Sequence, residues 1–259
     1  MTETVRSADG TEIVYERTGA GPAVILVGGA LSSRQSGVGL AGELSGRFTV
    51  YAYDRRGRGG SGDTKPYDVA REVEDLAALA ALSEEPPYLY GHSSGGALVL
   101  EAVNRGLDAA ALAVYEPPYM VAGEPDDGYA ALVSKAVEEG RPEEALALFI
   151  GNAMPDALEG MKQSPYWASL VGLAPTLPYD IAIVGDGAIP TERFDAITAP
   201  TLLLDGSASP AWAARAVDAI AASVPSSVRR TVEGYDHSVP NEVIAPILID
   251  FFDEVAPVK

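Results

Sequence analysis

The sequence predicts an α/β protein whose mostly parallel sheet is covered by helices on both faces. Short apolar runs alternate with stretches of helical periodicity along the 259 residues, a pattern typical of buried parallel strands joined by helices. One run leads into a G-x-S-x-G pentapeptide that opens a helical pattern, which is a strand–turn–helix context. The alternation breaks over residues 119–196, after a predicted strand end, where sheets of this class bind ligands.

The first half of the chain predicts a hairpin followed by buried strands. Residues 3–17 form two short strands around a turn at 8–10. Apolar runs at 23–27 and 48–53 predict parallel strands with a short helix between them. Residues 69–82 carry apolar side chains at helical spacing without glycine or proline, so we expect a helix there. The next apolar run enters the pentapeptide, and a helix follows it.

The second half resumes the alternation after one insertion. Residues 112–115 predict a buried strand that ends at Glu116. The insertion shows helical stretches at 129–139 and 143–150, and its apolar run at 181–184 is too short to assign. Further elements are expected as a strand at 201–204, a helix at 212–222, a strand at 228–232 and a helix at 241–255. We therefore expect a core made of 1–118 and 197–259, with a helical cap at 119–196.

The amino-acid composition excludes several classes of partner and of chemistry. A formal net charge of -19 argues against nucleic acid, anionic membrane surfaces and strongly anionic substrates as partners. The absence of cysteine excludes thiol catalysis and thiolate metal sites. We find no signal peptide pattern and no long apolar span, so a cytoplasmic location without membrane association is expected. No cofactor and no metal are implied, and the oligomeric state is left open.

The pentapeptide Gly91-His92-Ser93-Ser94-Gly95 predicts a nucleophilic serine. A sharp turn between strand and helix puts Ser93 in a strained backbone conformation and exposes its hydroxyl at the helix N-terminus. Free backbone N–H groups at that place favour a developing negative charge. The alternative interpretation is an ordinary turn rich in glycine and serine.

A serine hydroxyl needs a base, which is most often histidine. The chain contains only two histidines, His92 and His237. Since His92 is adjacent to Ser93, we expect its side chain to point elsewhere and to pack beside the turn. His237 lies between the last predicted strand and the last predicted helix, and we expect it to be the base rather than a surface-loop residue.

These features together resemble the α/β-hydrolase superfamily. The resemblance rests on the pentapeptide, the Gly28-Gly29 loop, the Asp54-x-Arg56-Gly57-x-Gly59-x-Ser61 loop, and the order of serine first and histidine last. It covers nearly the whole chain, with 119–196 as the cap. It implies an α/β-hydrolase fold with eight strands and the catalytic groups at the C-terminal edge of the sheet. Because this fold also hosts non-hydrolases, fold alone does not fix the reaction.

The resemblance also implies an oxyanion hole and a structural loop. By matching the family pattern, the backbone N–H groups of Ala30 and Ser94 are the expected donors, with Gly29 beside the substrate. The Asp54–Ser61 loop is expected to be structural, with Arg56 paired to a carboxylate. A dinucleotide-binding turn at 27–30 is disfavoured because the G-x-G-x-x-G spacing is absent.

The acid that orients His237 departs from the usual pattern. Most relatives carry an aspartate at the place of Ser209, which cannot act as a carboxylate. Some relatives carry the acid at the end of the preceding core strand, which is Glu116 here. We favour Glu116, with Asp205 as the alternative and a site without a working acid as the third possibility. Asp236 is expected to point away from His237.

The apolar side chains of the predicted cap indicate the class of substrate. Its apolar side chains, Tyr119 and Trp167 among them, are expected to divide between a cap core and a pocket that faces Ser93. We expect a serine hydrolase that acts on a medium-sized, uncharged, partly apolar small molecule, a carboxylic ester or lactone. The alternatives are non-hydrolytic chemistry on the same triad (carbon–carbon cleavage, lyase or perhydrolase reactions) and a ligand-binding protein with a vestigial site.

Overall fold

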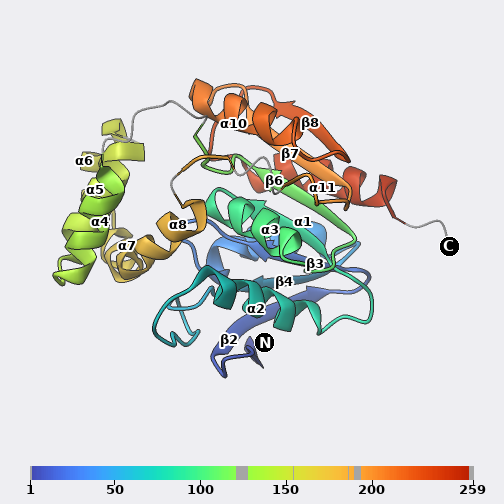
Figure 1. Ribbon diagram of the computed structural model, residues 1–259, viewed down its shortest axis with the longest axis horizontal. Coiled ribbons are helices and arrows are strands. Elements are labelled where there is room, and N and C mark those ends of the chain that lie inside the picture. The colour runs from blue at the N-terminus through green and yellow to red at the C-terminus, as the bar shows by residue number, and fades with distance from the viewer. Residues whose placement is uncertain (1, 121–127, 154, 186, 190–193, 257–259) are drawn as a thin grey trace.

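A computed structural model describes residues 2–120, 128–153, 155–185, 187–189 and 194–256 (Figure 1). Its sheet has eight strands in the order β1-β2-β4-β3-β5-β6-β7-β8. The strands β1 and β2 are antiparallel to their neighbours, and every pairing from β4 to β8 is parallel. The predicted eight-stranded, mostly parallel sheet is therefore confirmed. The strands are β1 (Thr2–Arg6), β2 (Glu12–Gly19), β3 (Ala23–Val27), β4 (Thr49–Tyr53), β5 (Tyr88–His92), β6 (Ala111–Tyr115), β7 (Thr201–Gly206) and β8 (Ser227–Val232).

The helices follow the predicted pattern closely. The elements outside the sheet are η1 (Arg34–Gly37), α1 (Val38–Leu44), α2 (Val69–Ala80), α3 (Ser94–Asn104), α4 (Tyr129–Glu138), α5 (Pro142–Ala153), η2 (Pro155–Ala157), α6 (Leu158–Lys162), α7 (Trp167–Leu173), η3 (Ala174–Thr176), α8 (Leu177–Val184), α10 (Ala211–Ala221) and α11 (Asn241–Glu254). The run at 181–184 that the sequence left unassigned is the last turn of α8, since helical periodicity continues through it from Leu177.

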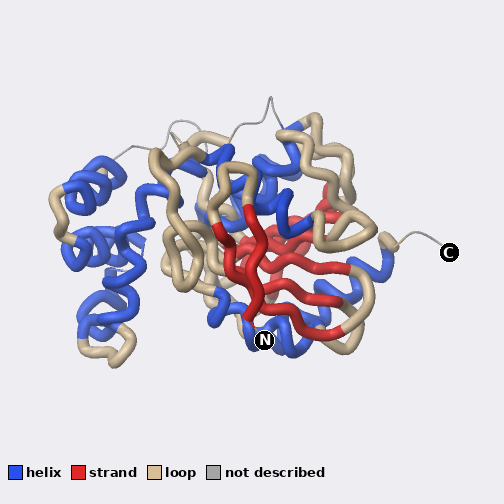
Figure 2. The backbone as a smooth tube through the Cα atoms, turned by 90° about the horizontal axis from the view of Figure 1, so that it is seen from below, coloured by secondary structure: helices blue, strands red, loops and turns tan. Residues whose placement is uncertain are grey.

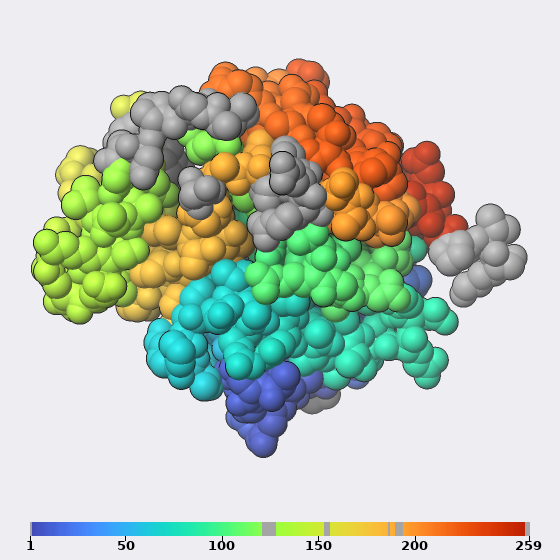
Figure 3. Space-filling model, viewed as in Figure 1, coloured from blue at the N-terminus to red at the C-terminus, as the bar shows by residue number. Residues whose placement is uncertain are grey.

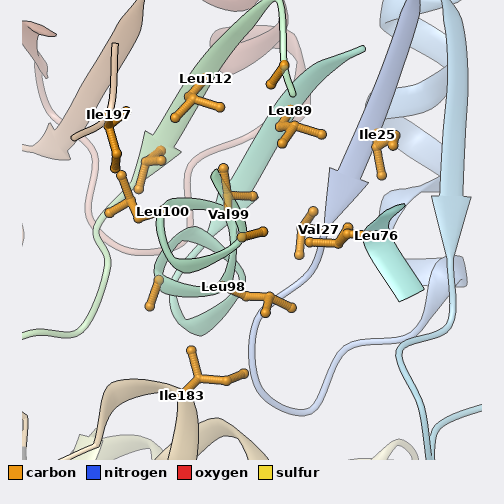
Figure 4. Close-up of a cluster of buried hydrophobic side chains, with 14 of the residues drawn as sticks. Ile25, Val27, Leu76, Leu89, Leu98, Val99, Leu100, Leu112, Ile183 and Ile197 are labelled. Atoms are coloured by element: carbon orange, nitrogen blue, oxygen red, sulfur yellow. The ribbon is translucent and has the colours of Figure 1, made fainter. Parts of the chain in front are cut away.

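Both faces of the sheet are buried, because successive strand residues point to opposite sides. Ile25 and Val27 pack with α2, α3 and α10, whereas Val24 and Leu26 pack with α1 and α11. Figure 4 shows the first of these layers, in which Leu98, Val99 and Leu100 of α3 lie against the strands. Two separate apolar layers around one sheet hold the strand ends at a single rigid edge.

The strand order creates a switch point beside β3. The chain passes from β3 to β4 on one side and to β5 on the other. At such a point the loops after the two strands diverge and leave a crevice at the carboxyl edge. Here the loop after β3 contains Gly28 to Leu31, and the turn after β5 contains Ser93. The topology therefore brings the two predicted halves of the oxyanion hole together.

The helices α4 to α8 lie between β6 and β7 in the chain. Figures 1 and 2 show α4 to α7 grouped beside the sheet, and α8 lying between that group and α3. They have their own buried apolar cluster, in which Val133, Leu146 and Leu177 are fully buried. The predicted cap range also includes 121–127, 154, 186 and 190–193, which lie outside the described residues. The division into core and cap stays a prediction.

Among the described residues one stretch, Trp167–Val184, is long and apolar enough to cross a membrane by length and composition alone. A core helix of a soluble protein passes the same test, so a single stretch is weak evidence. This stretch is interrupted by η3, and its Asp180 side chain forms buried ion pairs with Arg55 and Arg58. Because Arg55 and Arg58 belong to the loop after β4, these pairs show that the stretch packs against the core of the protein.

Candidate active site

The turn after β5 has the strained geometry that the pentapeptide predicts. Ser93 has φ 55° and ψ -127° and directly precedes α3. Its carbonyl accepts hydrogen bonds from the N–H groups of Gly96 and Ala97 at 2.8 and 3.2 Å. A Cβ atom on Gly95 would lie 2.2 Å from the Val27 carbonyl oxygen, so only glycine allows α3 to approach β3 this closely. The glycines of the motif therefore make the close packing that the turn requires.

Backbone strain is concentrated around this turn. Among the described residues, Leu31, Ser93 and Glu116 are the non-glycine residues with positive φ. They follow β3, β5 and β6, which are adjacent strands. A conformation of this kind costs about 1–3 kcal/mol per residue and persists where the surrounding structure enforces it, commonly at functional sites. The three positions mark one region at the carboxyl edge of the sheet.

The loop after β3 lies directly against Ser93. A Cβ atom on Gly29 would be 2.9 Å from Ser93 Cβ and 3.5 Å from Ser93 Oγ. Among the hydrogen bonds of the described residues, none uses the backbone N–H of Ala30 or Ser94 as donor. An oxyanion hole needs two such donors beside the serine, and here one belongs to the residue after Ser93 and the other to the loop packed against it. The assignment of Ala30 and Ser94 stays a prediction, and the packing of the loop favours it.

Glu116 and His237 are in contact at the end of β6. His237 Nδ1 lies 2.7 Å from Glu116 Oε2. The Glu116 side chain is fully buried, whereas the His237 side chain is 39% exposed. With a proton on Nδ1 shared with the carboxylate, Nε2 is left free to accept a proton from a hydroxyl. Of the carboxylates that the sequence offered, Glu116 is the one that the structure brings to His237.

The buried Glu116 carboxyl is held as an anion by several donors. Burial alone would raise its pKa, but hydrogen bonds from His237, the Ser209 hydroxyl and the Gly206 N–H lower the pKa below its usual value. The Gly206 N–H donates to Oε1 at 2.8 Å, and the Ser209 hydroxyl donates to the same oxygen. Ser209 occupies the usual place of the acid, and here its side chain supports the acid from the neighbouring strand.

Asp205 is turned towards a different partner. Its carboxylate accepts hydrogen bonds from Arg229 and Thr231, at 3.2 and 3.1 Å. Burial raises the pKa of Asp205, and the Arg229 charge opposes that shift. Asp236 is also occupied elsewhere, because its Oδ1 accepts from the backbone N–H of Ser238 at 2.8 Å. Neither carboxylate has a hydrogen bond to His237 within the described part of the chain.

His92 packs beside the turn, and its ring lies next to the ring of His237. The two ring centroids are 4.7 Å apart, and the Tyr115 ring packs against His92 edge to face, with the centroids 5.4 Å apart. The buried Nε2 of His92 has no hydrogen-bond partner. Burial lowers the pKa of His92 to about 3, with a further contribution from His237. A neutral His92 adds no repulsion when His237 becomes a cation.

Ser93 and His237 are not in hydrogen-bond contact in this structure. No hydrogen bond between the Ser93 hydroxyl and His237 occurs among the described residues. Bonds of this kind are often long before substrate binds and shorten in the reacting complex. The His92 ring lies against His237, and the Ser93 N–H donates to the Tyr115 carbonyl at 2.9 Å. The segments that follow β5, β6 and β8 thus place Ser93, Glu116 and His237 at one edge of the sheet.

The two predicted substrate-binding side chains are placed differently. Tyr119 is only 2% exposed and packs in the main core against Phe194. It lines a cavity of about 370 Å³ that Glu101 and Arg105 also line, and Ser93 is not part of that cavity. This position gives a substrate role for Tyr119 no support, because the side chain lies in the core. Such a role stays a prediction.

Trp167 opens α7 and connects two helices of the insertion. Its Nε1 donates to Glu143 at 3.1 Å, and the ring packs against the apolar cluster of α4 to α8. The same cluster has Ala30 and Leu31 packed against its edge. Trp167 therefore belongs to the packing unit that borders the loop after β3, and its role in substrate selection stays a prediction.

The sequence reasoning missed Arg58 and Asp180. Arg58 donates from Nη1 to the Gly29 carbonyl at 2.6 Å, and its Nη2 donates to Asp180 at 2.6 Å. Asp180 also accepts from the Ser94 hydroxyl at 2.7 Å. A signal existed, because Asp180 is the only charge in the apolar stretch 177–184, and a buried carboxylate requires a cationic partner. Arg56 pairs with Asp75, which confirms the expected pairing of Arg56 with a carboxylate.

No metal-binding group of three or more His, Asp or Glu side chains occurs within the described ranges.

Comparison with known proteins gives similarities to one family in sequence and in fold. The model of the alpha/beta hydrolase family matches residues 23–245. A solved alpha/beta hydrolase from Sphaerobacter thermophilus is 45% identical, with a TM-score of 0.91, over 96% of this chain and 100% of that chain. The esterase RhEst1 from Rhodococcus sp. shares the fold at 22% identity and a TM-score of 0.74, over 98% of this chain and 99% of that one.

A curated relative matches a shorter part. The uncharacterized hydrolase YraK of Bacillus subtilis is 32% identical over 96 residues. That match spans 36% of this chain and only 35% of the length of that protein, which is about a third.

Proposed function

This chain belongs to the alpha/beta hydrolase family, and on that premise we propose that it is a serine hydrolase acting through an acyl-enzyme. The observation that carries the proposal is the 2.7 Å contact of His237 with the buried Glu116 carboxylate, at the same sheet edge as the strained Ser93. This pairing favours one tautomer of His237, with its free nitrogen available as a base.

In the first half-reaction, the Ser93 hydroxyl attacks the carbonyl carbon of the substrate. His237 accepts the hydroxyl proton at Nε2, and Glu116 stabilises the resulting imidazolium through Nδ1. The negative oxygen of the tetrahedral intermediate accepts hydrogen bonds from the N–H groups of Ala30 and Ser94. His237 then gives its proton to the departing alkoxide, which leaves as an alcohol, and Ser93 carries the acyl group.

The second half-reaction repeats these steps with water. His237 removes a proton from a water molecule, the hydroxide adds to the acyl carbon, and the same two N–H groups bind the oxyanion. The intermediate collapses, the carboxylic acid leaves, and Ser93 recovers its proton from His237. Water supplies the atoms that balance the reaction, so no cofactor is required.

We propose a medium-sized, uncharged, partly apolar carboxylic ester or lactone as substrate. The net charge of -19 disfavours anionic substrates, and the apolar cluster of α4 to α8 borders the loop after β3. The esterase from Rhodococcus lends support at the level of the fold. A cytoplasmic location is proposed as well.

The test is a panel of activated aryl esters of increasing acyl chain length, together with simple lactones, at neutral pH. We expect turnover that peaks at an intermediate chain length and that Ser93→Ala abolishes. A protein that binds these compounds without turnover would instead favour the ligand-binding alternative. Turnover that survives in Ser93→Ala would show that another group is the nucleophile.

A further inference from the structure

A buried polar network connects α8 to both sides of the predicted oxyanion hole. It consists of Arg55 and Arg58 from the loop after β4, Glu72 from α2, Asp180 from α8 and Ser94 from α3. The two arginine side chains are 2% and 0% exposed, and the two carboxylates are 1% and 4% exposed. Two cations and two anions balance each other, so the buried network carries no net charge.

The first connection acts on the peptide that contains the Ala30 N–H. A trans peptide is planar, so its carbonyl and its N–H point in opposite directions. The carbonyl of that peptide belongs to Gly29, and it accepts from Arg58 Nη1 at 2.6 Å and from the Ser32 hydroxyl at 2.6 Å. Because both lone pairs of the oxygen are used, the plane is fixed, and the N–H is fixed with it.

A charged donor on the carbonyl also polarises the peptide. Hydrogen bonds in series strengthen one another in a medium of low dielectric constant. The Arg58 guanidinium therefore makes the Ala30 N–H a better donor as well as holding its direction. The preceding carbonyl, that of Gly28, accepts from Arg55 Nη1 at 3.3 Å, which holds the same loop at a second point.

The second connection acts on Ser94. Its hydroxyl donates to Asp180 Oδ1 at 2.7 Å, while Arg58 donates to the other oxygen of the same carboxylate. Ser94 is 2% exposed and is the first residue of α3. One carboxylate therefore joins the residue that supplies one N–H to the arginine that orients the other.

Asp180 belongs to α8, the helix that links the insertion to the core. Figure 4 shows Ile183 of α8 beneath Leu98 of α3, and Figure 3 shows the surface of the α7–α8 region between the α4–α5 lobe and the surface of α2. Arg58 Nε also donates to Thr176, just before α8, at 3.1 Å. Through Arg58 and Ser94, the position of α8 therefore affects the position of both donor peptides.

We propose that Arg58 and Asp180 are positioning residues that hold the Ala30 and Ser94 N–H groups in the geometry of an oxyanion hole. The proposal rests on the proposed function, because it assigns these two N–H groups to the tetrahedral intermediate. Neither side chain touches the reacting atoms. Loosening the network changes the transition state, which needs both donors, much more than it changes substrate binding.

The chain provides a matched control. Arg56 and Asp75 form a second fully buried bidentate pair, with side chains 0% and 1% exposed, on the same loop and on α2. That pair makes no hydrogen bond to residues 28–30 or to Ser94. Asp75→Asn and Asp180→Asn therefore each remove one buried charge, and only Asp180 is bonded to the Ser94 hydroxyl and to Arg58, whose guanidinium contacts the Gly29 carbonyl.

The experiment compares these two variants with the unmodified chain in ester turnover. We expect Asp180→Asn to lower kcat about 10- to 100-fold with KM within about threefold, since loss of one complete donor costs about 10²–10³. We expect Asp75→Asn to lose thermal stability while kcat stays within about threefold. Equal losses of kcat in both variants, or no loss in Asp180→Asn, would overturn the proposal.

A second readout does not depend on turnover. Backbone ¹⁵N relaxation reports the order parameters of the Ala30 and Ser94 amides, and a rigid backbone has a value of about 0.85. We expect Asp180→Asn to lower both values towards about 0.6, and Asp75→Asn to leave them unchanged. Unchanged order at both amides in Asp180→Asn would refute the positioning role even if the chain proved to be no hydrolase.

Asp180→Asn leaves two buried arginines undercompensated and could prevent folding. Ser94→Ala is the alternative variant, because it removes one hydroxyl and keeps the backbone N–H. We expect it to lower kcat about three- to tenfold, with the order parameter of residue 94 reduced. If Ser94→Ala retains both full kcat and full order, the connection through Asp180 has no role in positioning.

Discussion

Replacing Glu116 by glutamine tests the relay beside Ser93, and the structure determines how the new amide must lie. Glu116 Oε1 accepts from the Gly206 N–H at 2.8 Å and from the Ser209 hydroxyl. The glutamine oxygen must take this place, because an amide NH₂ cannot accept from two donors. The NH₂ group then faces His237 Nδ1 where Oε2 now lies, 2.7 Å away.

That orientation forces the wrong tautomer on the base. With a donor opposite it, Nδ1 of His237 must accept, so the ring proton moves to Nε2. Nε2 then has no lone pair with which to take the Ser93 proton. The analogous loss of the orienting carboxylate in a serine protease costs about 10⁴ in kcat. We expect Glu116→Gln to lower kcat about 10²- to 10⁴-fold, which is about 2.7–5.4 kcal/mol of activation free energy.

The assay is ester turnover with circular dichroism and thermal unfolding as controls for folding. Asp205→Asn is the matched variant, and because Asp205 bonds to Arg229 and Thr231 rather than His237, we expect a loss below about tenfold. The reasoning would be refuted if Asp205→Asn lost activity and Glu116→Gln kept it. If both variants kept full activity, His237 would act without an orienting acid.

Placing the acid at position 209, where most relatives carry it, gives a second check of the relay. The Ser209 hydroxyl already contacts the Glu116 carboxylate, so a carboxylate at position 209 lies next to the place that it should fill. Adding Ser209→Asp to Glu116→Gln should recover part of the lost activity. Ser209→Asp alone puts two carboxylates together, and we expect it to reduce stability through their repulsion. No recovery in the double variant would mean that the loop after β7 cannot turn the new side chain towards His237.

Three further predictions follow from the same contacts. Gly29→Ala places a Cβ 2.9 Å from Ser93 Cβ. We expect kcat to fall about 10- to 100-fold in a folded protein, because a shift of about 1 Å at the site has effects of that size. A fully active variant would show that this loop is not part of the oxyanion hole. Folding lowers the pKa of His92 from 6.5 to about 3, so the unfolded chain binds a proton first and the free energy of unfolding falls as the pH drops from 6.5 towards 3. Between pH 7 and pH 5, chemical denaturation should show that His92→Gln loses up to about 2 kcal/mol less of this free energy than the unmodified chain. Identical pH profiles of the two proteins would contradict this. Trp167→Ala should change the preferred acyl chain length while Ser93 still reacts, and an unchanged ranking of the ester panel would limit Trp167 to packing.

The sequence carries most of the fold because the core strands leave a strong pattern. The runs at 23–27 and 112–115 are apolar on both faces, and a parallel strand covered by helices on both faces requires this. The pentapeptide locates Ser93 because glycine is required where α3 and β3 touch. Glu116 could be singled out because it directly ends a strand and because position 209 holds a serine.

The network around Asp180 could not be predicted, because its members are far apart in the chain. Arg58 and Asp180 are 122 residues apart, and nothing local in either segment specifies the partner. Tyr119 shows the opposite limit. An aromatic residue just after a strand fits a pocket and a core equally well in sequence, and in the structure Tyr119 packs against Phe194 in the core. Both contacts depend on long-range packing, which periodicity does not record.

The most direct test of the account is to identify the residue that becomes covalently modified. The chain is incubated with a fluorophosphonate probe, digested and analysed by mass spectrometry, with Ser93→Ala and a known serine esterase as controls. The account predicts one added probe per chain, on the peptide that contains Gly91–Gly95, with the modification on Ser93 and none in Ser93→Ala. Modification of another residue, or an unmodified chain while the esterase reacts fully, would contradict it.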